Sequence, residues 1–394
     1  MTRRQRRSLS DQGGSVEVAG AESERRLLER ALLAGSGPDD HLTHGFHTYP
    51  ARMHPGIARA VVEGLSEPGQ RVLDPFCGSG TVLVEALCAG RAAVGVDLSP
   101  LALRVAEVHC HIAHGADRAR FEARLERIVD ASLERVRARV PARAPLSAAE
   151  RAHYEPHVLI ELAGLFEEIA RHGGEDRRAL EMVASSLLVK LSRQRSDTAV
   201  RAADKRIRKG LASELMLRKG RELSQRWAAL HAALPPAPHA PELREGDARR
   251  LGEVLAGEAK FDLCVSSPPY GGTYDYLQHH ARRYAWLGLD SGRLQRFEVG
   301  ARRRLSSARG APARWDRELG DCLRSIASRL RPSALLALLL GDAELAGRRV
   351  DAAEQVARLA PQAGLSPLAR ASQRRQDWRG GKSRREHLLL LTKR

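Results

Sequence analysis

Two short stretches of the sequence combine residue types and spacing that could do chemistry. The first is DPFCGSGT, residues 74–81, where an apolar run passes through a glycine-rich turn into a run with helical spacing. Ligands of open α/β sheets bind at such turns, outside the carboxyl ends of the strands. Gly78 and Gly80 let a ligand approach the backbone, and Asp74 can accept hydrogen bonds, including those of an ammonium group. The turn therefore predicts a ligand site.

A second acidic residue follows the next apolar run. Asp97 ends the run RAAVGVD, and a carboxylate at that place can bind both hydroxyls of a ribose. A nicotinamide dinucleotide site would use the same acid but requires G-x-G-x-x-G, and Leu83 stands where the third glycine would be. A pyrophosphate is therefore not the predicted ligand.

The second stretch is SSPPY, residues 266–270. Two consecutive prolines fix the backbone, which holds the Ser267 hydroxyl and the adjoining carbonyl in place as hydrogen-bond acceptors. Tyr270 offers an aromatic face. Rigid acceptors beside an aromatic platform suit the exocyclic amino group of a base that is flipped out of its stack. Tyr274 and Tyr276 would either extend this platform or pack in the core.

Histidines and cysteines give weaker signals. His109, His111 and His114 cluster at the expected end of a helix, where histidine is favourable without a metal, so we predict no metal site. The five cysteines have no C-x-x-C spacing, which is typical of reduced thiols in a cytosolic protein.

The surrounding sequence predicts the elements that position these residues. The runs RVL, AAVGVD, FDLCVS, SALLALLLGD and EHLLLLTKR predict strands, and PELREGDARRL predicts another strand with a turn. Unbroken apolar runs suit strands that helices cover on both faces. One helix is expected from Thr81 to Gly90. The next should have Ser99 as its cap, begin at Pro100 and end at Gly115.

Residues 116–232 differ from their surroundings. They are rich in Arg, Ala, Leu and Glu with helical periodicity, and the proline-rich connector LPPAPHAP follows at residues 234–241. We therefore predict three parts. Residues 1–40 form a basic, flexible arm, residues 41–115 and 240–394 form an α/β domain, and residues 116–239 form a helical insertion that ends in the connector.

The charge of the chain indicates a polyanionic partner. It has 65 Lys and Arg against 48 Asp and Glu, a net charge of +17, and nucleic acid is the first candidate for such an excess. An arginine-rich composition typical of GC-rich genomes is the alternative explanation. Residues 190–226 carry 12 basic and 4 acidic residues. No apolar run approaches the ~18 residues needed to cross a bilayer and no secretory signal is evident, so we expect a cytoplasmic protein without membrane contact.

Taken together, DPFCGSGT, VDLSP, EGDA and SSPPY resemble the ordered motifs of the S-adenosylmethionine-dependent DNA amino methyltransferase family, of N4-cytosine and N6-adenine type. The segment HTYPARMHPGIARAVV is similar to the tenth motif of that family when it is placed N-terminally. The serine in SSPPY resembles the N4-cytosine branch. The resemblance covers about residues 41–115 and 240–394, and it implies a seven-stranded Rossmann-like methyltransferase sheet with an inserted helical region.

The resemblance also implies a role for individual residues. Asp74, Phe76, Gly78 and Gly80 would hold the methionine part of S-adenosylmethionine, Asp97 its ribose and Asp247 its adenine. The implied cofactor site further includes the neighbouring residues Pro75, Thr81 and Leu98, and it is closed from the N-terminal side by Tyr49, Pro50 and Arg52. The target base would be held by Ser267, Pro268, Pro269 and Tyr270.

The expected function is methyl transfer to an exocyclic amino nitrogen of a nucleobase, cytosine N4 in DNA, with a restriction-system protein as a possible partner. Methylation at cytosine C5 is disfavoured because it needs a cysteine nucleophile, and SPPYGG contains none. Two alternatives stay open: an RNA amino methyltransferase, for example on guanine N2, and a non-catalytic nucleic-acid-binding protein. The sequence does not decide the oligomeric state.

Overall fold

Short apolar runs of the sequence become adjacent parallel strands at the centre of the fold. These strands are buried on both faces along most of their length, as expected for strands that helices cover on both sides. They are β2 (Arg71–Asp74), β3 (Ala92–Asp97), β5 (Phe261–Ser266) and β6 (Leu330–Gly341). A more exposed strand, β4 (Glu242–Glu245), pairs with β3 in the same direction. Parallel pairing brings the carboxyl ends of these strands, and the motifs that follow them, to one edge.

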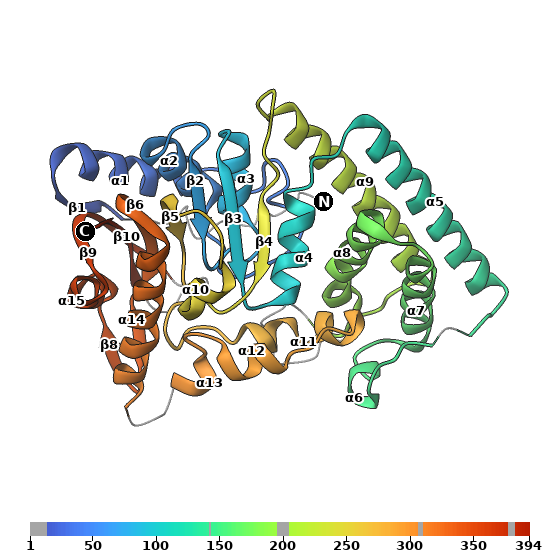
Figure 1. Ribbon diagram of the computed structural model, residues 1–394. Coiled ribbons are helices and arrows are strands. Elements are labelled where there is room, and N and C mark those ends of the chain that lie inside the picture. Colours follow the sequence, from blue (N-terminus) through green and yellow to red (C-terminus); the bar gives the residue numbers. More distant parts are fainter. Residues whose placement is uncertain (1–13, 142, 195–204, 306–309, 377–382) are drawn as a thin grey trace.

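The computed structural model describes residues 14–141, 143–194, 205–305, 310–376 and 383–394. Within this part of the chain the main sheet has eight strands, in the order β1-β9-β10-β6-β5-β2-β3-β4 (Figure 1). β10 (Ser383–Lys393) runs antiparallel to both β6 and β9 (Leu365–Gln376). The predicted α/β sheet is therefore confirmed, with one strand more than the seven expected.

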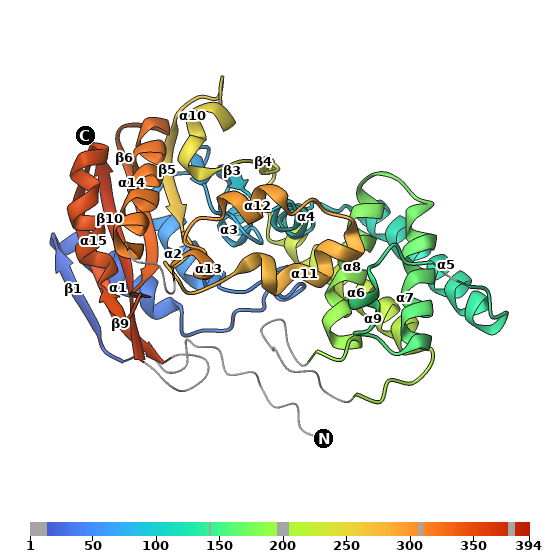
Figure 2. The ribbon, with the colours of Figure 1, turned by 90° about the horizontal axis from the view of Figure 1, so that it is seen from below.

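The extra strand comes from the segment predicted to be a flexible arm. β1 (Val16–Gly20) pairs antiparallel with β9, and α1 (Glu22–Ala34) packs beside it with Leu28 and Leu32 fully buried. Both views show these N-terminal elements alongside the C-terminal strands (Figures 1 and 2). The prediction of an unstructured arm was thus wrong for residues 16–34, because pairing with a distant strand orders them. Residues 1–13 lie outside the described residues.

Two hydrophobic clusters cover the two faces of the sheet. One face packs against α1, α2 (Pro55–Leu65) and α3 (Thr81–Cys88), and the other against α14 (Ala311–Arg329) and α15 (Ala352–Leu359). Shorter elements complete the chain around the sheet. They are η2 (Ala248–Arg250), α10 (Leu251–Val254), α13 (Arg302–Leu305), β7 (Ala343–Leu345), β8 (Arg348–Val350) and η3 (Ala360–Ala363).

The inserted region is helical, as its periodicity predicted. A third hydrophobic cluster joins its helices to α4 (Pro100–His109) and to α11 (Tyr276–Leu287) and α12 (Gly292–Phe297). In Figure 1, α11 and α12 (orange) run below the sheet toward the inserted helices (green). Because the two regions share this cluster, the predicted domain boundaries remain a prediction. The inserted helices are α5 (Gly115–Arg137), α6 (Ala148–Arg151), α7 (Pro156–Ala170), α8 (Gly174–Leu191) and α9 (Leu211–Ala232).

The helix that begins at Pro100 has the predicted cap but ends early. Ser99 is its N-cap and accepts a hydrogen bond from the Ala102 amide. The helix was expected to continue to Gly115, yet it ends at His109. The side chains of Trp227 and Thr43 donate to the carbonyls of Val108 and His109, so distant residues satisfy the end of the helix. No helix in the described part of the chain is long and apolar enough to span a membrane.

Candidate active site

A cavity opens at the carboxyl ends of β2, β3, β4 and β5. Both sequence motifs reach it, together with the segment before α2 and the turn after β4. The predicted residues that line it are Tyr49, Arg52, Asp74, Pro75, Phe76, Gly78, Thr81, Asp97, Leu98, Asp247, Ser267 and Pro269.

Four predicted residues lie next to the cavity without lining it. Gly80 is the N-cap of α3 with φ +83°, and a Cβ there would lie 3.0 Å from the Cβ of Ala106, so this glycine permits helix packing. Pro268 is buried, and Pro50 is half-buried beside Tyr49. The side chain of Tyr270 is directed to β10, where its hydroxyl donates to Oε1 of Glu386 at 2.7 Å.

The glycine-rich turn is built for close approach to its backbone. Gly78 has φ +50°, in the left-handed region that favours glycine. Its amide donates to Oδ2 of Asp97 at 2.9 Å, and an added Cβ would lie 3.3 Å from Cε1 of Tyr49. The carbonyl of Ser79 receives a hydrogen bond from Nδ1 of His109 at 2.8 Å. His109, a residue of the histidine cluster at the helix end, therefore supports the turn from behind.

Asp97 joins the ends of two neighbouring strands. Besides the Gly78 amide, the Ser99 amide donates to its carboxylate at 2.8 Å. Burial raises the pKa of Asp97 to about 6, because the charged form loses hydration that the backbone amides only partly replace. Each carboxylate oxygen retains acceptor capacity, so the group can still bind ligand hydroxyls.

Asp74 links the two sequence motifs directly. The hydroxyl of Ser266, the first serine of SSPPY, donates to Oδ1 of Asp74 at 2.6 Å, and the Phe76 amide donates to the same oxygen at 3.1 Å. Burial raises the pKa of Asp74 to about 7. The hydrogen bond fixes the end of β5 against the end of β2, so the glycine-rich turn and the Pro-Pro turn are held in one arrangement.

Asp247, in the turn after β4, is already paired. It is the N-cap of η2, and its Oδ2 lies 2.6 Å from the Arg249 guanidinium. Arg249 also donates to the carbonyl of Phe297 at 2.9 Å. This pairing ties the turn after β4 to the last residue of α12. An adenine amino group would therefore share the Asp247 carboxylate with Arg249.

The segment after SSPPY supplies a wall of the cavity that motifs did not predict. Tyr276, Leu294, Glu298 and Val299 line it. Tyr276 stacks on Tyr49 with ring centroids 6.0 Å apart. Its amide donates to Oε1 of Glu298 at 2.8 Å, and burial raises the pKa of Glu298. The tyrosines after SSPPY were visible in the sequence, whereas Glu298 lies in no recognisable motif. Further lining residues missed by sequence are Ala51, Met53, Cys77, Ser79, Val82, Ser99, Gly246 and Ala248.

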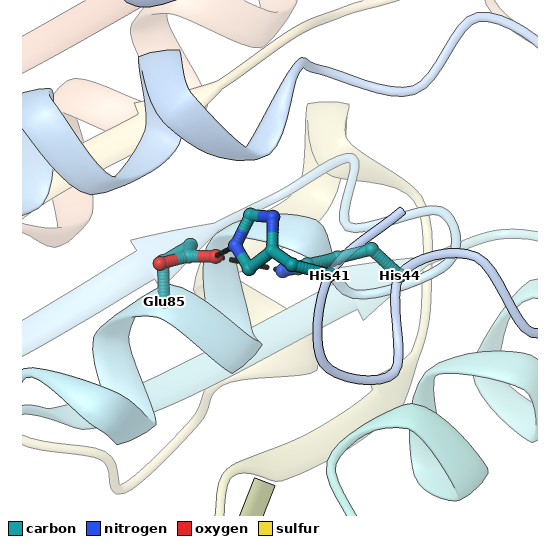
Figure 3. A group of neighbouring side chains, drawn as sticks. All are labelled: His41, His44 and Glu85. Atoms are coloured by element: carbon teal, nitrogen blue, oxygen red, sulfur yellow. Dashed lines mark hydrogen bonds and ion pairs between the residues drawn. The ribbon is translucent and has the colours of Figure 1, made fainter. Parts of the chain in front are cut away.

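A buried ionic network holds the N-terminal wall against α3. Figure 3 shows His41 and His44 converging on Glu85, with His44 Nε2 2.7 Å and His41 Nε2 3.2 Å from Oε1. Arg59 donates to the other carboxylate oxygen at 2.9 Å, and its guanidinium lies 2.8 Å from His41 Nε2. Burial alone would raise the pKa of Glu85, but these hydrogen bonds lower it. The three groups could by type ligate a metal. Because the Arg59 guanidinium already supplies the positive charge, we assign them a structural role.

Comparison with known proteins agrees with the arrangement of the motifs. Residues 24–108 match the model of a family described as DNA methylase. The type II methyltransferase M.BsoBI of Geobacillus stearothermophilus is 23% identical over 311 residues, which cover 69% of this chain and 58% of that protein. These matches support a likeness to an amino-methyltransferase family.

Other similar proteins have the names of RNA methyltransferases. A tRNA (guanine(10)-N2)-dimethyltransferase of Methanothermobacter thermautotrophicus is 48% identical over 52 residues, 13% of this chain and 15% of that protein. Among solved structures, the rRNA methyltransferase aviRa of Streptomyces viridochromogenes shares 14% identity at a TM-score of 0.37, covering 91% of this chain and 94% of its own. The chain spans less than two thirds of the length of the curated relatives it matches.

S-adenosylmethionine is the methyl donor of the family, and the chemistry of the cavity fits it. Asp74 and Asp97 line the cavity, as do Asp247 and Glu298, which are ion-paired with Arg249 and Arg303. Carboxylates gathered in a buried cavity attract a ligand that carries a sulfonium and an ammonium group. The cationic lining residue Arg52 is occupied elsewhere, donating to Asp39 and to the carbonyl of His44.

Proposed function

We propose that this amino methyltransferase transfers a methyl group from S-adenosylmethionine to N4 of cytosine in DNA. The observation that carries the proposal is the hydrogen bond of 2.6 Å between Ser266 and Asp74. It joins the Pro-Pro turn to the glycine-rich turn, so that Ser267 and Pro269 line the same cavity as the carboxylates Asp74 and Asp97. A methyl donor and an acceptor base bound there would meet.

The chain's own residues supply position and electrostatics. The lone pair of an aromatic amino group is delocalised into its ring and is therefore a poor nucleophile. Acceptors at Ser267 and at the adjoining Pro268 carbonyl would take hydrogen bonds from the amino group and direct its lone pair into the cavity. The bound cofactor supplies a methyl group on a positively charged sulfur. After transfer, the extra amino proton leaves to solvent.

A covalent route through cysteine has no support in this site. Cys264 lies on β5 just before the Pro-Pro turn and is completely buried. Burial raises the pKa of its thiol well above the ordinary value, and the reactive form of a cysteine nucleophile is the thiolate. This supports attack by an exocyclic amino group rather than methylation at C5.

The charge distribution supports a nucleic-acid substrate. Arg206, Arg208 and Lys209 are exposed just before α9, in the basic stretch of the inserted region. Basic side chains that contact phosphates supply affinity without sequence readout. The type II name of M.BsoBI supports DNA as the substrate, and a restriction enzyme would then be the functional partner.

The experiment is a methyl-transfer assay with tritiated S-adenosylmethionine on DNA and on RNA, followed by mass spectrometry of the nucleosides. We expect label in N4-methylcytosine. Ser267→Ala should reduce turnover by roughly 10²–10³, the scale for losing one preorganised hydrogen-bonding group, and leave cofactor affinity nearly unchanged. Label in N6-methyladenine or 5-methylcytosine would refute the choice of base, and full activity of Ser267→Ala would refute the mechanism.

RNA guanine N2 is the second candidate. It is favoured by the 48% identity over 52 residues to the tRNA (guanine(10)-N2)-dimethyltransferase. Label that appears only in RNA guanine would establish it. A non-catalytic nucleic-acid-binding protein is the third possibility, and a calorimetric titration that detects no binding of S-adenosylmethionine would establish that one instead.

A further inference from the structure

The side chain of Tyr270 is fixed by two neighbouring strands. Its ring lies over Gly341 at the end of β6, where an added Cβ would come within 2.6 Å of Cε2 and 2.7 Å of Cδ2. Gly341 pairs directly with Glu386 on β10. Side chains of directly opposed residues stand on the same face of a sheet, so the missing side chain of Gly341 leaves the space that the tyrosine ring fills beside Glu386.

Glu386 determines the direction of the hydrogen bond that Tyr270 makes. Its Oε1 accepts from the Tyr270 hydroxyl at 2.7 Å, and its Oε2 is paired with Nε of Arg375 on β9 at 2.9 Å. A carboxylate can only accept, so the single hydroxyl proton of Tyr270 is used on Glu386. Both acidic and basic partners are largely shielded, with side chains 18% and 13% exposed.

Ser267 and Pro269 line the cavity and belong to the same Pro-Pro turn that ends in Tyr270. Holding the Tyr270 side chain against β10 therefore fixes the turn that carries the Ser267 acceptor.

We infer that Glu386 is a positioning residue for the methyl-transfer site, acting through the Tyr270 hydroxyl to hold in place the Pro-Pro turn that carries Ser267. The inference rests on the proposed function and adds to it a positioning contact from the C-terminal strands. Arg384, two residues before Glu386, donates to Oγ1 of Thr273 at 3.1 Å. The start of β10 therefore holds residues 267–273 at two points, at Tyr270 in the Pro-Pro turn and at Thr273 just beyond it.

The test compares Tyr270→Phe, Glu386→Gln and Glu386→Ala with the wild type. Phe removes only the hydroxyl, and Gln keeps the size of Glu386 but can donate, which allows the bond to reverse. We expect kcat to fall about 10- to 100-fold, the scale for misplacing a reacting group, with the Kd of S-adenosylmethionine changed less than twofold. The double variant Tyr270→Phe/Glu386→Ala should be no slower than the slower single variant, because the two residues act as one unit.

Arg385→Gln is the matched control. Arg385 is adjacent to Glu386 on β10, and its substitution removes an ion pair with Glu17 on β1. It should leave kcat unchanged. Amide hydrogen exchange of residues 270–273, which does not depend on activity, should accelerate in Glu386→Ala and stay unchanged in Arg385→Gln. If the wild type is active, any of three results would overturn the inference. These are an unchanged kcat in the variants, losses of kcat that multiply in the double variant, and unchanged amide hydrogen exchange of residues 270–273 in Glu386→Ala. Inactive wild type on every nucleic acid would instead refute the proposed function, and the exchange measurement would still decide whether Glu386 holds the loop.

Discussion

Asp97 offers the sharpest test of the cofactor site, because its carboxylate accepts hydrogen bonds from two backbone amides and also lines the cavity. Replacing it with Asn removes the charge while retaining one acceptor oxygen and the size of the side chain. The carboxylate would make charge-assisted hydrogen bonds to ligand hydroxyls, and such bonds contribute about 1.5–3 kcal/mol. At 1.4 kcal/mol for each tenfold change, the Kd of S-adenosylmethionine should rise about 10- to 150-fold at pH 8.

The loss of cofactor affinity caused by Asp97→Asn should be larger at high pH than at low pH. A cationic ligand favours the ionised carboxylate, so binding lowers the pKa of Asp97 and releases a proton when the pH is near that pKa. With a pKa of about 6, Asp97 is about one-tenth ionised at pH 5 and almost fully ionised at pH 8. The wild type should therefore lose about tenfold in affinity through this group on going from pH 8 to pH 5. The Asn variant has no such group, so its disadvantage shrinks as the pH falls.

Isothermal titration calorimetry with S-adenosylmethionine at pH 8 and pH 5 measures both effects. The control is Asp130→Asn, which removes an exposed carboxylate on α5 and should leave the Kd unchanged at either pH. An Asp97→Asn variant that binds within threefold of the wild type at pH 8 would refute the assignment of Asp97 to the cofactor. A penalty that is equally large at pH 5 would show that the charge of Asp97 is not what the ligand uses.

Three further predictions concern the turn, the ionic network and the inserted region. Gly78→Val should abolish cofactor binding by calorimetry, whereas Gly69→Val should not, since Gly69 has a similar left-handed φ of +84° but open space around its Cβ position; equal losses would mean that backbone strain alone matters. Glu85→Gln should lower the free energy of unfolding in urea by about 2 kcal/mol at pH 7. Since the pKa of Glu85 is lowered in the fold, this difference is present above the unfolded pKa of about 4.3 and should narrow toward pH 3; a constant difference would contradict the network. Changing Arg206, Arg208 and Lys209 to Gln should weaken DNA binding for all sequences alike and reduce the log–log salt slope by up to about 0.9 per lost phosphate contact; an unaltered slope would remove this surface from the interface.

The parts of the fold that were predictable from sequence depend on local signals. A few neighbouring residues are enough to predict the strand that ends at Asp97, the cap at Ser99 and the glycine-rich turn. β1 does not, because a short strand at the edge of a sheet is ordered by a partner, β9, that lies far away in the chain. The helix that ends at His109 is cut short for the same reason, by Thr43 and Trp227.

The candidate site shows the same division. Most of the predicted cofactor residues line one cavity, since parallel strands must bring their carboxyl ends to a single edge. Glu298 was missed because its place in the cavity depends on the path of the chain through α11 and α12. The partner of Tyr270 was missed as well, since Glu386 is 116 residues away and no pattern in SSPPY specifies it.

The hydrophobic cluster shared by the inserted helices, α4 and α11 has a consequence for protein engineering. Trp286 is buried against the inserted helices and donates to the Tyr154 hydroxyl at 3.0 Å, while Leu294 belongs both to that cluster and to the cavity wall. Deleting residues 116–239 would therefore expose the apolar sides of α4 and α11 and open the cavity, rather than yield a minimal catalytic fragment. A chimera that exchanges the insertion for that of a relative must also exchange residues 276–297, because the two segments form one module that is split in the sequence.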